Sequence, residues 1–256
     1  VNPLLKRKAF IWWNFPVSDY VRDRLLLGAV YGNGTDIDDD ISAFISNPME
    51  HAEASKIALF SIADYAWNMD AYKSDASWRR AVRYLMPGHA AALQVFASHN
   101  SDLGGNEHDF RREESEQIRP ALERLLDAYC REGKREVAAA SAVTEECERM
   151  IASADLLLAS DENPALIKEI SPWLIQFKLL GEYGREVLCM LAAQCDGKKT
   201  ELEKAASHAK ALQVLMKKID ATYNQNGFQP GVKTGSCHLK PAFDRLYQEV
   251  VQRTGK

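Results

Sequence analysis

Apolar and polar positions near the N-terminus follow two alternating patterns. Short aromatic and β-branched runs at residues 9–13 and 41–46 predict buried strands. Helical spacing predicts a helix over residues 19–27 and another that ends at Trp67. This strand–helix–strand–helix order is typical of a parallel α/β sheet.

A parallel sheet needs more strands than this stretch supplies. Parallel strands need neighbouring strands, and they need helices over both faces of the sheet. Two strands cannot meet that need alone. We therefore expect residues 1–72 to be the C-terminal end of a larger α/β domain, with the earlier strands upstream of this chain.

From residue 74 onward the pattern is almost wholly helical. Apolar residues recur at intervals of three and four, and the pair Asn163-Pro164 is typical of a helix start. Residues 224–237 contain Gly, Pro and Asn and predict a loop before a final helix. Amphipathic helices of this kind pack as a bundle. We therefore expect residues 73–256 to form an all-α helical bundle domain.

Composition excludes several classes of protein. Of the 256 residues, 46% are hydrophobic and 27% charged, which is typical of a globular chain. The formal charge of −4 argues against a nucleic-acid partner, since such proteins usually carry a basic surplus. Apolar stretches are far shorter than the roughly 20 residues that a membrane span needs, so no membrane partner is expected.

Patterns for metals and cofactors are weak. The five cysteines are scattered without a CxxC pair, and the histidines suggest no ligand set. The acidic run at residues 36–40 lacks the Gly and the distant Glu of a calcium loop, and a solvated run of charge explains it better. No phosphate-binding loop or metalloprotease motif occurs. We expect neither a metal nor a cofactor.

One segment combines residue types that suit a sugar. Trp12, Asn14 and Asp19 follow or end the first predicted strand, and Asn47 ends the second. Aromatic faces contact the C–H face of a sugar ring, and amide and carboxylate groups bind its hydroxyls. Structural explanations stay open for three positions: Trp13 as core packing, Asn47 as a helix cap before Pro48 and Glu50, and Asp19 as a charge at a helix start.

The same segment resembles glycoside hydrolase family 84, the β-N-acetylglucosaminidases that include O-GlcNAcases and bacterial enzymes described as hyaluronidases. The resemblance is carried by seven stretches: WWNFPVSDYVRD (12–23), LLLG (25–28), VYGN (30–33), SNPMEHAEASK (46–56), HNSDLG (99–104), RREES (111–115) and QPGVKT (229–234). The stretches cover nearly the whole chain, and motifs as long as the longest of them are highly specific.

The resemblance implies a fold and a reaction. The fold is a (β/α)₈ TIM barrel followed by a helical bundle, so the two strands here would be the last two of the barrel. The reaction removes a terminal N-acetylglucosamine with retention, and the 2-acetamido group of the substrate acts as nucleophile. Two adjacent aspartates assist: one orients the acetamido group, and the other is general acid and then base.

The resemblance also assigns roles to four residues, all in substrate binding. Asp19 and Asn47 would hold hydroxyls on the far side of the sugar. Asn14 would bind near the scissile bond or the acetamido group, and Trp12 would wall the acetamido pocket. The catalytic pair lies on an earlier strand of the family's barrel, and the run at residues 38–40 does not match it. We therefore expect no catalytic residue in this chain.

These inferences lead to one main hypothesis and one alternative. The main hypothesis is the C-terminal portion of a β-N-acetylglucosaminidase, inactive alone, whose partners are the missing N-terminal barrel portion and a glycan or glycoprotein that carries N-acetylglucosamine. O-GlcNAc proteins, mucin glycans and hyaluronan fit equally as substrates. The family resemblance favours a secreted or periplasmic location. The alternative is a non-catalytic helical module that binds a protein or a glycan.

Overall fold

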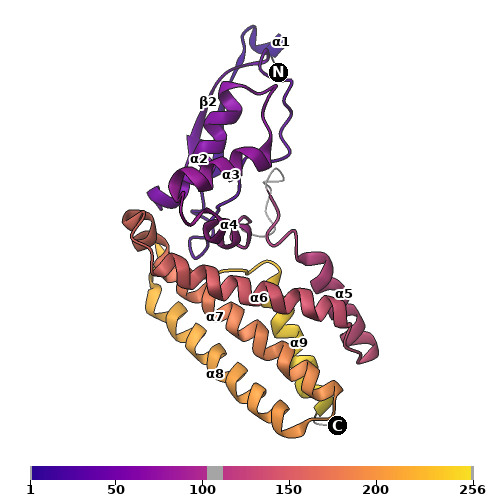
Figure 1. Cartoon of the computed structure of the whole chain (residues 1–256). Helices are drawn as coiled ribbons and strands as arrows, with labels where there is room; N and C mark the ends of the chain where they lie inside the picture. The colour runs from indigo at the N-terminus through magenta and orange to yellow at the C-terminus, as the bar shows by residue number, and fades with distance from the viewer. Residues whose placement is uncertain (1, 103–111, 255–256) are drawn as a thin grey trace.

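The computed structural model describes residues 2–102 and 112–254 (Figure 1). Leu103, Gly104 and Arg111, which belong to the motifs quoted above, lie outside the described residues. The N-terminal elements are α1 (Asn2–Leu5), β1 (Ala9–Pro16), β2 (Ile41–Asn47), α2 (Ala52–Trp67), α3 (Ser74–Leu85) and α4 (Ala90–Ser98). The C-terminal elements are α5 (Arg119–Glu132), α6 (Val137–Leu158), α7 (Pro164–Cys195), α8 (Lys199–Tyr223), β3 (Asn224–Asn226), β4 (Gln229–Pro230) and α9 (Leu239–Thr254).

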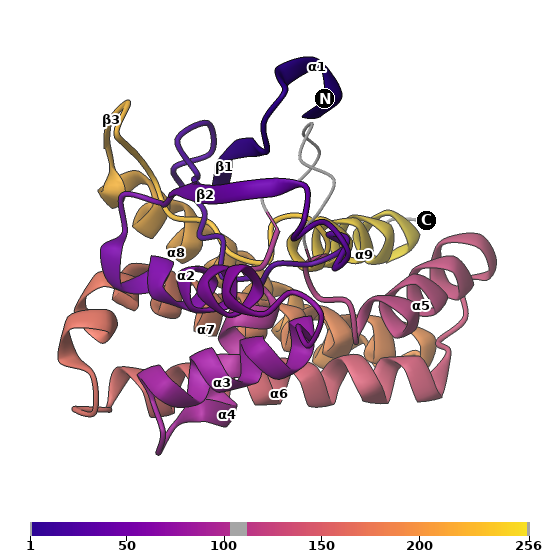
Figure 2. The ribbon, with the colours of Figure 1, turned by 90° about the horizontal axis from the view of Figure 1, so that it is seen from above.

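The two predicted strands form and pair in parallel. Register pairs include Trp12 with Ile45 and Trp13 with Ser46. One face of the pair packs on α2, which lies between the strands and α7 (Figure 2). On that face the Trp13 ring is 5.4 Å from Phe44 and 5.9 Å from Tyr65. The other face is uncovered, with Phe10 61%, Trp12 67% and Ile45 43% exposed.

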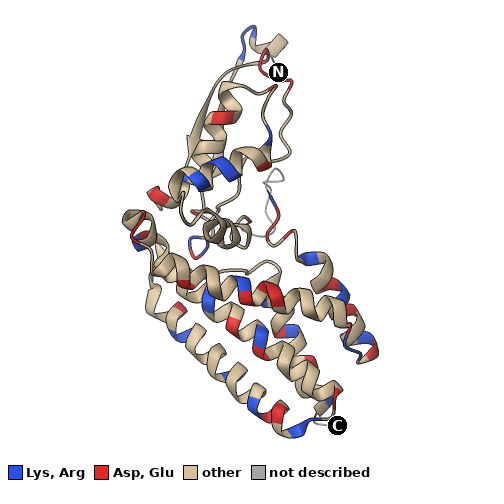
Figure 3. Cartoon of the chain, viewed as in Figure 1, with Lys and Arg blue, Asp and Glu red and all other residues tan. Residues whose placement is uncertain are grey.

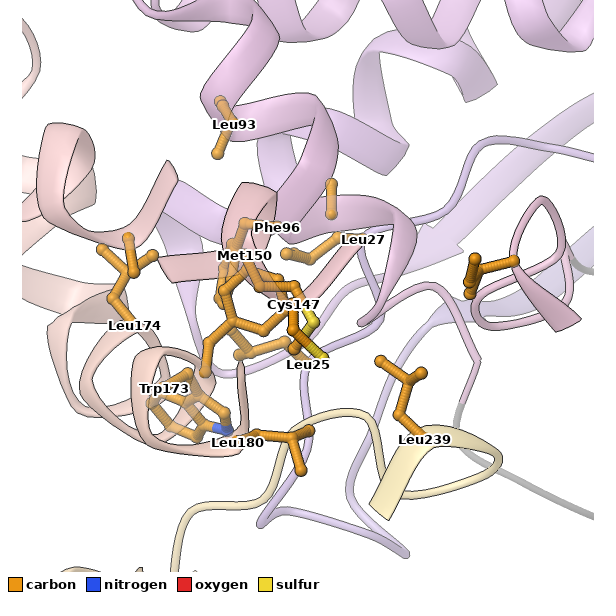
Figure 4. Close-up of a cluster of buried hydrophobic side chains, with 14 of the residues drawn as sticks. Leu25, Leu27, Leu93, Phe96, Cys147, Met150, Trp173, Leu174, Leu180 and Leu239 are labelled. Atoms are coloured by element: carbon orange, nitrogen blue, oxygen red, sulfur yellow. The ribbon is translucent and has the colours of Figure 1, made fainter. Parts of the chain in front are cut away.

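The prediction of a helix over residues 19–27 is wrong. The segment is a turn followed by extended chain, and Leu25, Leu26 and Leu27 are all buried. A helix would bury one face, whereas this segment is enclosed on every side. Figure 4 shows Leu25 and Leu27 among side chains of the helices, including Phe96 of α4 and Met150 of α6. The apolar run therefore marks a buried extended segment.

The backbone groups of this segment bond to distant parts of the chain. The Leu27 N–H donates to the Asn100 carbonyl over 2.8 Å, and the Trp78 indole N–H donates to the Leu27 carbonyl. Farther along, the Val30 N–H donates to the Ser61 hydroxyl. Buried peptide groups need such partners because taking an N–H or C=O group out of water without a hydrogen bond costs free energy. These bonds hold the extended form in place of a helix.

Asn47 does not cap a helix, because α2 begins at Ala52 and Asn47 is the last residue of β2. The helix is capped instead by a carboxylate from α7. Glu169 accepts from the N–H of Ala54 at 2.8 Å and of Glu53 at 3.3 Å. A carboxylate at a helix N-terminus satisfies free N–H groups and complements the helix dipole.

The C-terminal helices form as the periodicity predicts, and the structure packs α6, α8 and α9 against α7. Asn163 caps α7 through the Leu166 N–H, and the helix continues past Pro172. At Gly184 an added Cβ would lie 2.5 Å from the Phe243 ring of α9, so only glycine allows this approach. The loop predicted at 224–237 contains the short antiparallel β3–β4 hairpin.

Acidic and basic residues are interspersed along the C-terminal helices (Figure 3). This mixture fits the modest net charge of −4. Within residues 2–102 and 112–254, no helix has both the length and the apolar character needed to cross a bilayer.

Replacing Glu169 by Ala should destabilise the protein by about 1–2 kcal/mol, because two N–H groups at the start of α2 lose their acceptor. Urea unfolding followed by circular dichroism measures this change. Glu203→Ala, at an exposed position of α8, is the matched control and should change stability by less than about 0.5 kcal/mol. Equal stability of the two variants would contradict the capping role.

Candidate functional site

The carboxyl ends of β1 and β2 bring three of the four predicted sugar-binding residues together. The Trp12 indole Nε1 donates to Asn14 Oδ1 over 2.9 Å, and Asn47 Nδ2 donates to the same oxygen over 3.2 Å. Trp12 and Asn14 are two residues apart, so they share the uncovered face of the strand. Asn14 thus joins the ends of the two strands.

Asp19 lies in the turn that follows β1, and its side chain is exposed. Among the described residues, no hydrogen bond joins Asp19 to the other three predicted residues. Its backbone carbonyl accepts from Arg22 Nε, and Arg22 Nη1 pairs with Glu50 at 2.7 Å. The Arg22 guanidinium also lies 5.1 Å from the Phe228 ring, so the β3–β4 hairpin reaches this turn.

Trp13 and the acidic run at residues 36–40 both lie away from this edge of the sheet. Trp13 packs against the core on the α2 side of the sheet, which is the structural explanation left open from the sequence. The acidic run at 36–40 precedes β2, whereas Asn47 ends it. The length of β2 therefore places the acidic run about 20 Å from Asn47. No group of three His, Cys, Asp or Glu side chains among the described residues is placed to hold a metal ion.

A second polar cluster, absent from the sequence-based predictions, is buried where the two parts of the chain meet. His99 Nδ1 lies 2.8 Å from the Ser115 hydroxyl, and His99 Nε2 lies 2.7 Å from Glu146. Arg149 in turn pairs with Glu146. Burial lowers the pKa of His99 to about 4. A neutral imidazole fits these contacts, because Nε2–H can donate to Glu146 while Nδ1 accepts from Ser115.

The order serine, histidine, glutamate is that of a nucleophile triad, but this cluster is enclosed. Ser115 is 2% exposed and His99 1% exposed. The adjoining cavity has a volume of about 20 Å³, room for no more than a water molecule. A substrate cannot reach the hydroxyl, so the cluster is structural.

Glu114 extends the same cluster toward α9. Its carboxylate accepts from the N–H groups of Cys237 and His238 at 3.0–3.2 Å. Burial raises the pKa of Glu114 above its usual value, although these hydrogen bonds oppose the rise. The cluster therefore ties the segment before α5 to the loop before α9.

Protein-family models match both the N-terminal and the C-terminal part of the chain. The model described as "Bacterial GH84, post-catalytic domain" matches residues 114–247, and that of β-N-acetylglucosaminidase matches residues 1–98. The chain belongs to glycoside hydrolase family 84.

Curated relatives of this family 84 chain match over a short region. The protein O-GlcNAcases of Rattus norvegicus and Mus musculus are each 32% identical over 76 residues, which is 29% of this chain and 8% of the relative.

Solved structures match nearly the whole chain. CpGH84D has a TM-score of 0.83 and 26% identity over 98% of this chain, and CpGH84B has 0.84 and 24% over 96%. A mutant of the Thermobaculum terrenum O-GlcNAc hydrolase has 0.75 and 20% over 99%. The match spans 41%, 40% and 51% of those three chains, respectively. The family 84 chain therefore spans about half or less of each of these structures.

Sequence reasoning missed the His99 cluster for a simple reason. It treated the histidines as isolated because they are far apart along the chain. A usable signal was present: polar residues gather at 99–102 and 112–115, between apolar helical stretches, and both stretches belong to the family motifs. Buried polar residues of this kind need one another as partners.

The lowered pKa of His99 predicts a pH dependence of stability. The unfolded chain binds the His99 proton near pH 6.5, whereas the folded chain binds it only near pH 4. Stability should therefore be complete above pH 6.5 and decrease as pH falls toward 4, by on the order of 3 kcal/mol. Urea unfolding between pH 4 and 7 measures the slope.

The variant His99→Gln keeps an amide that can donate to Glu146 and accept from Ser115 but cannot titrate. Its stability should depend less steeply on pH over this interval. His208→Gln, at an exposed position of α8, should keep the slope of the unmodified chain. A slope unchanged in His99→Gln would show that another group causes it.

Proposed function

We propose that this chain supplies the sugar-binding part of a retaining β-N-acetylglucosaminidase and that an N-terminal barrel portion supplies the catalytic acid. The observation that carries the proposal is the hydrogen-bonded set Trp12, Asn14 and Asn47 at the carboxyl ends of two parallel strands. Family 84 membership supports it. In α/β barrels this edge of the sheet carries the ligand-binding groups.

The proposal makes β1 and β2 the last two strands of a (β/α)₈ barrel within residues 1–72, followed by the helical domain at 73–256. The uncovered face of the strands supports this arrangement. Phe10, Trp12 and Ile45 are large apolar side chains that a closed barrel would enclose, whereas water would otherwise contact them. The solved family structures are more than twice as long, which leaves room for the preceding strands.

Asn14 has a defined role in this proposal. Its oxygen accepts from two donors, Trp12 Nε1 and Asn47 Nδ2, which fixes the amide orientation. With the oxygen so occupied, Nδ2 is the group that Asn14 can offer to a substrate. An amide N–H directed at the sugar would bind the acetamido carbonyl or a ring oxygen.

Asp19 and Trp12 complete the sugar contacts. The exposed Asp19 carboxylate would accept hydrogen bonds from two hydroxyls on the far side of the sugar, contacts that are strong because the acceptor is charged. The Trp12 ring, 67% exposed, would cover the acetamido methyl group. Both groups bind and orient, and neither needs to transfer a proton.

The chemical step would use the 2-acetamido oxygen of the substrate as nucleophile. It attacks the anomeric carbon while an acid protonates the leaving oxygen, and an oxazoline intermediate forms that water then opens with retention. Two aspartates of the N-terminal portion would orient the acetamido group and move the proton. Residues of this chain would keep the sugar aligned for that attack.

In the enzyme with both portions present, Asp19→Ala should lower kcat/KM on 4-nitrophenyl β-N-acetylglucosaminide by about 30- to 1,000-fold. This corresponds to the loss of about 2–4 kcal/mol from charge-assisted contacts to hydroxyls. Asp70→Ala, at another exposed aspartate, is the control and should leave kcat/KM unchanged. Wild-type kcat/KM for Asp19→Ala would reject the assignment.

The 256-residue chain alone should release no nitrophenol from the same substrate, because the proposal places the catalytic acid outside it. Adding the N-terminal portion, fused or co-expressed, should restore turnover. Hydrolysis by the purified chain that disappears in Asp19→Ala would place the full machinery within these residues and refute the division of roles.

A further inference from the structure

Arg22, in the turn after β1, contacts three segments that are distant from one another along the chain. Its Nε donates to the Asp19 carbonyl at 3.1 Å, and its Nη1 pairs with Glu50 at 2.7 Å. Its guanidinium lies 5.1 Å from the ring centroid of Phe228 in the β3–β4 hairpin. Glu50 comes three residues after Asn47, so Arg22 connects the Asp19 turn to the segment that follows Asn47.

The β3–β4 hairpin is well placed to hold this arginine. Figure 2 shows the hairpin rising from α8 to the level of the strands. At its tip, Asn226 Oδ1 accepts from the Phe228 N–H at 2.8 Å. After the hairpin, the Lys233 N–H donates to the Asp23 carbonyl at 2.7 Å, and the Lys233 ammonium pairs with the Asp23 carboxylate. The helical part of the chain therefore holds residues 22 and 23 at two successive points.

The Asp19 carboxylate depends on the backbone of its turn for its position. The side chain is exposed, and within residues 2–102 and 112–254 its carboxylate has no hydrogen bond or ion pair. A carboxylate that binds two sugar hydroxyls at once has to be held to within about 0.5 Å of its productive position. The Arg22 contact with the Asp19 carbonyl is the side-chain hydrogen bond that restrains this turn.

Arginine is suited to this task where lysine is not. Its guanidinium is planar and carries five N–H donors in fixed directions, so separate donors bond to Asp19 and Glu50 while the group lies over Phe228. The Arg22 side chain is 23% exposed, so water has limited access to these contacts. A lysine ammonium is a point charge and cannot reproduce this planar arrangement.

We propose that Arg22 is a positioning residue of the sugar site and that Phe228 of the hairpin holds it in place. Arg22 fixes the Asp19 turn relative to the segment after Asn47, so the Asp19 carboxylate is already in place when the sugar binds. The inference rests on the sugar-binding role proposed above for Asp19. It gives the helical part of the chain a share in substrate affinity, although that part lies outside the strands.

The experiment is a double-mutant cycle in the enzyme with both portions present, with 4-nitrophenyl β-N-acetylglucosaminide as substrate. Arg22→Ala should lower kcat/KM by about 10- to 100-fold. The change should be mainly a rise in KM, because Asp19 contacts the sugar in the bound substrate as well as in the transition state. In an Asp19→Ala background, Arg22→Ala should change kcat/KM by less than about threefold, since it acts through Asp19.

Conservative variants separate positioning from charge and from folding. Arg22→Lys keeps the charge but should be impaired nearly as much as Arg22→Ala. Phe228→Leu should raise KM about two- to fivefold, and Phe228→Tyr, which keeps the ring, should not share this defect. The matched control is Arg185→Ala, which breaks a similar bridge from α7 to Glu148 of α6 and should leave KM unchanged.

The outcomes distinguish failure of this inference from failure of the proposed function. Wild-type kcat/KM in Asp19→Ala would reject the sugar contact and the positioning role together. An impaired Asp19→Ala beside a wild-type KM in Arg22→Ala would reject the positioning role alone. Effects of the two substitutions that add in full would also reject it, because Arg22 would then act independently of Asp19. A partly unfolded Arg22→Ala would have a lower apparent kcat with an unchanged KM, which also contradicts positioning.

Discussion

Satisfying the backbone of one buried extended segment is the constraint on which this structure depends. Residues 23–30 have no strand partner along most of their length, so their peptide groups bond to side chains and loops of the helices around them. Trp173 of α7 and the Lys233 N–H both donate to the Asp23 carbonyl, and Tyr72 donates to the carbonyl of Val30. Leaving these groups unpaired would cost about 1–3 kcal/mol each.

This segment also connects the strand ends to the helical domain. It follows directly from the turn that carries Asp19, so the helices that enclose it hold that turn in place. Glu169 strengthens the connection by reaching from α7 to cap α2, the helix that supports the strands. The two parts of the chain therefore share one hydrophobic core. Residues far from the strand ends can position those ends through this core.

Asp23 joins the segment that follows the Asp19 turn to the helical part of the chain. Its carbonyl accepts from the Trp173 indole N–H, and its carboxylate pairs with Lys233 in the loop before α9. His99 and Glu146 are hydrogen-bonded and buried at the same junction, so the junction contains polar groups as well as apolar ones. The two parts of this chain are thus joined through hydrogen bonds as well as apolar packing.

Local periodicity in the sequence determined the strands that contain Trp12 and Asn47 and most of the helices. It also placed Trp12, Asn14 and Asn47 at neighbouring strand ends, because parallel strands end at one edge. Tertiary structure alone decided that the leucines at 25–27 are extended and that Glu169 caps α2. A segment enclosed on all sides has no amphipathic period, and its hydrogen-bond partners are distant in sequence. The His99 cluster could not be predicted for the same reason, since its members meet only after the helices pack.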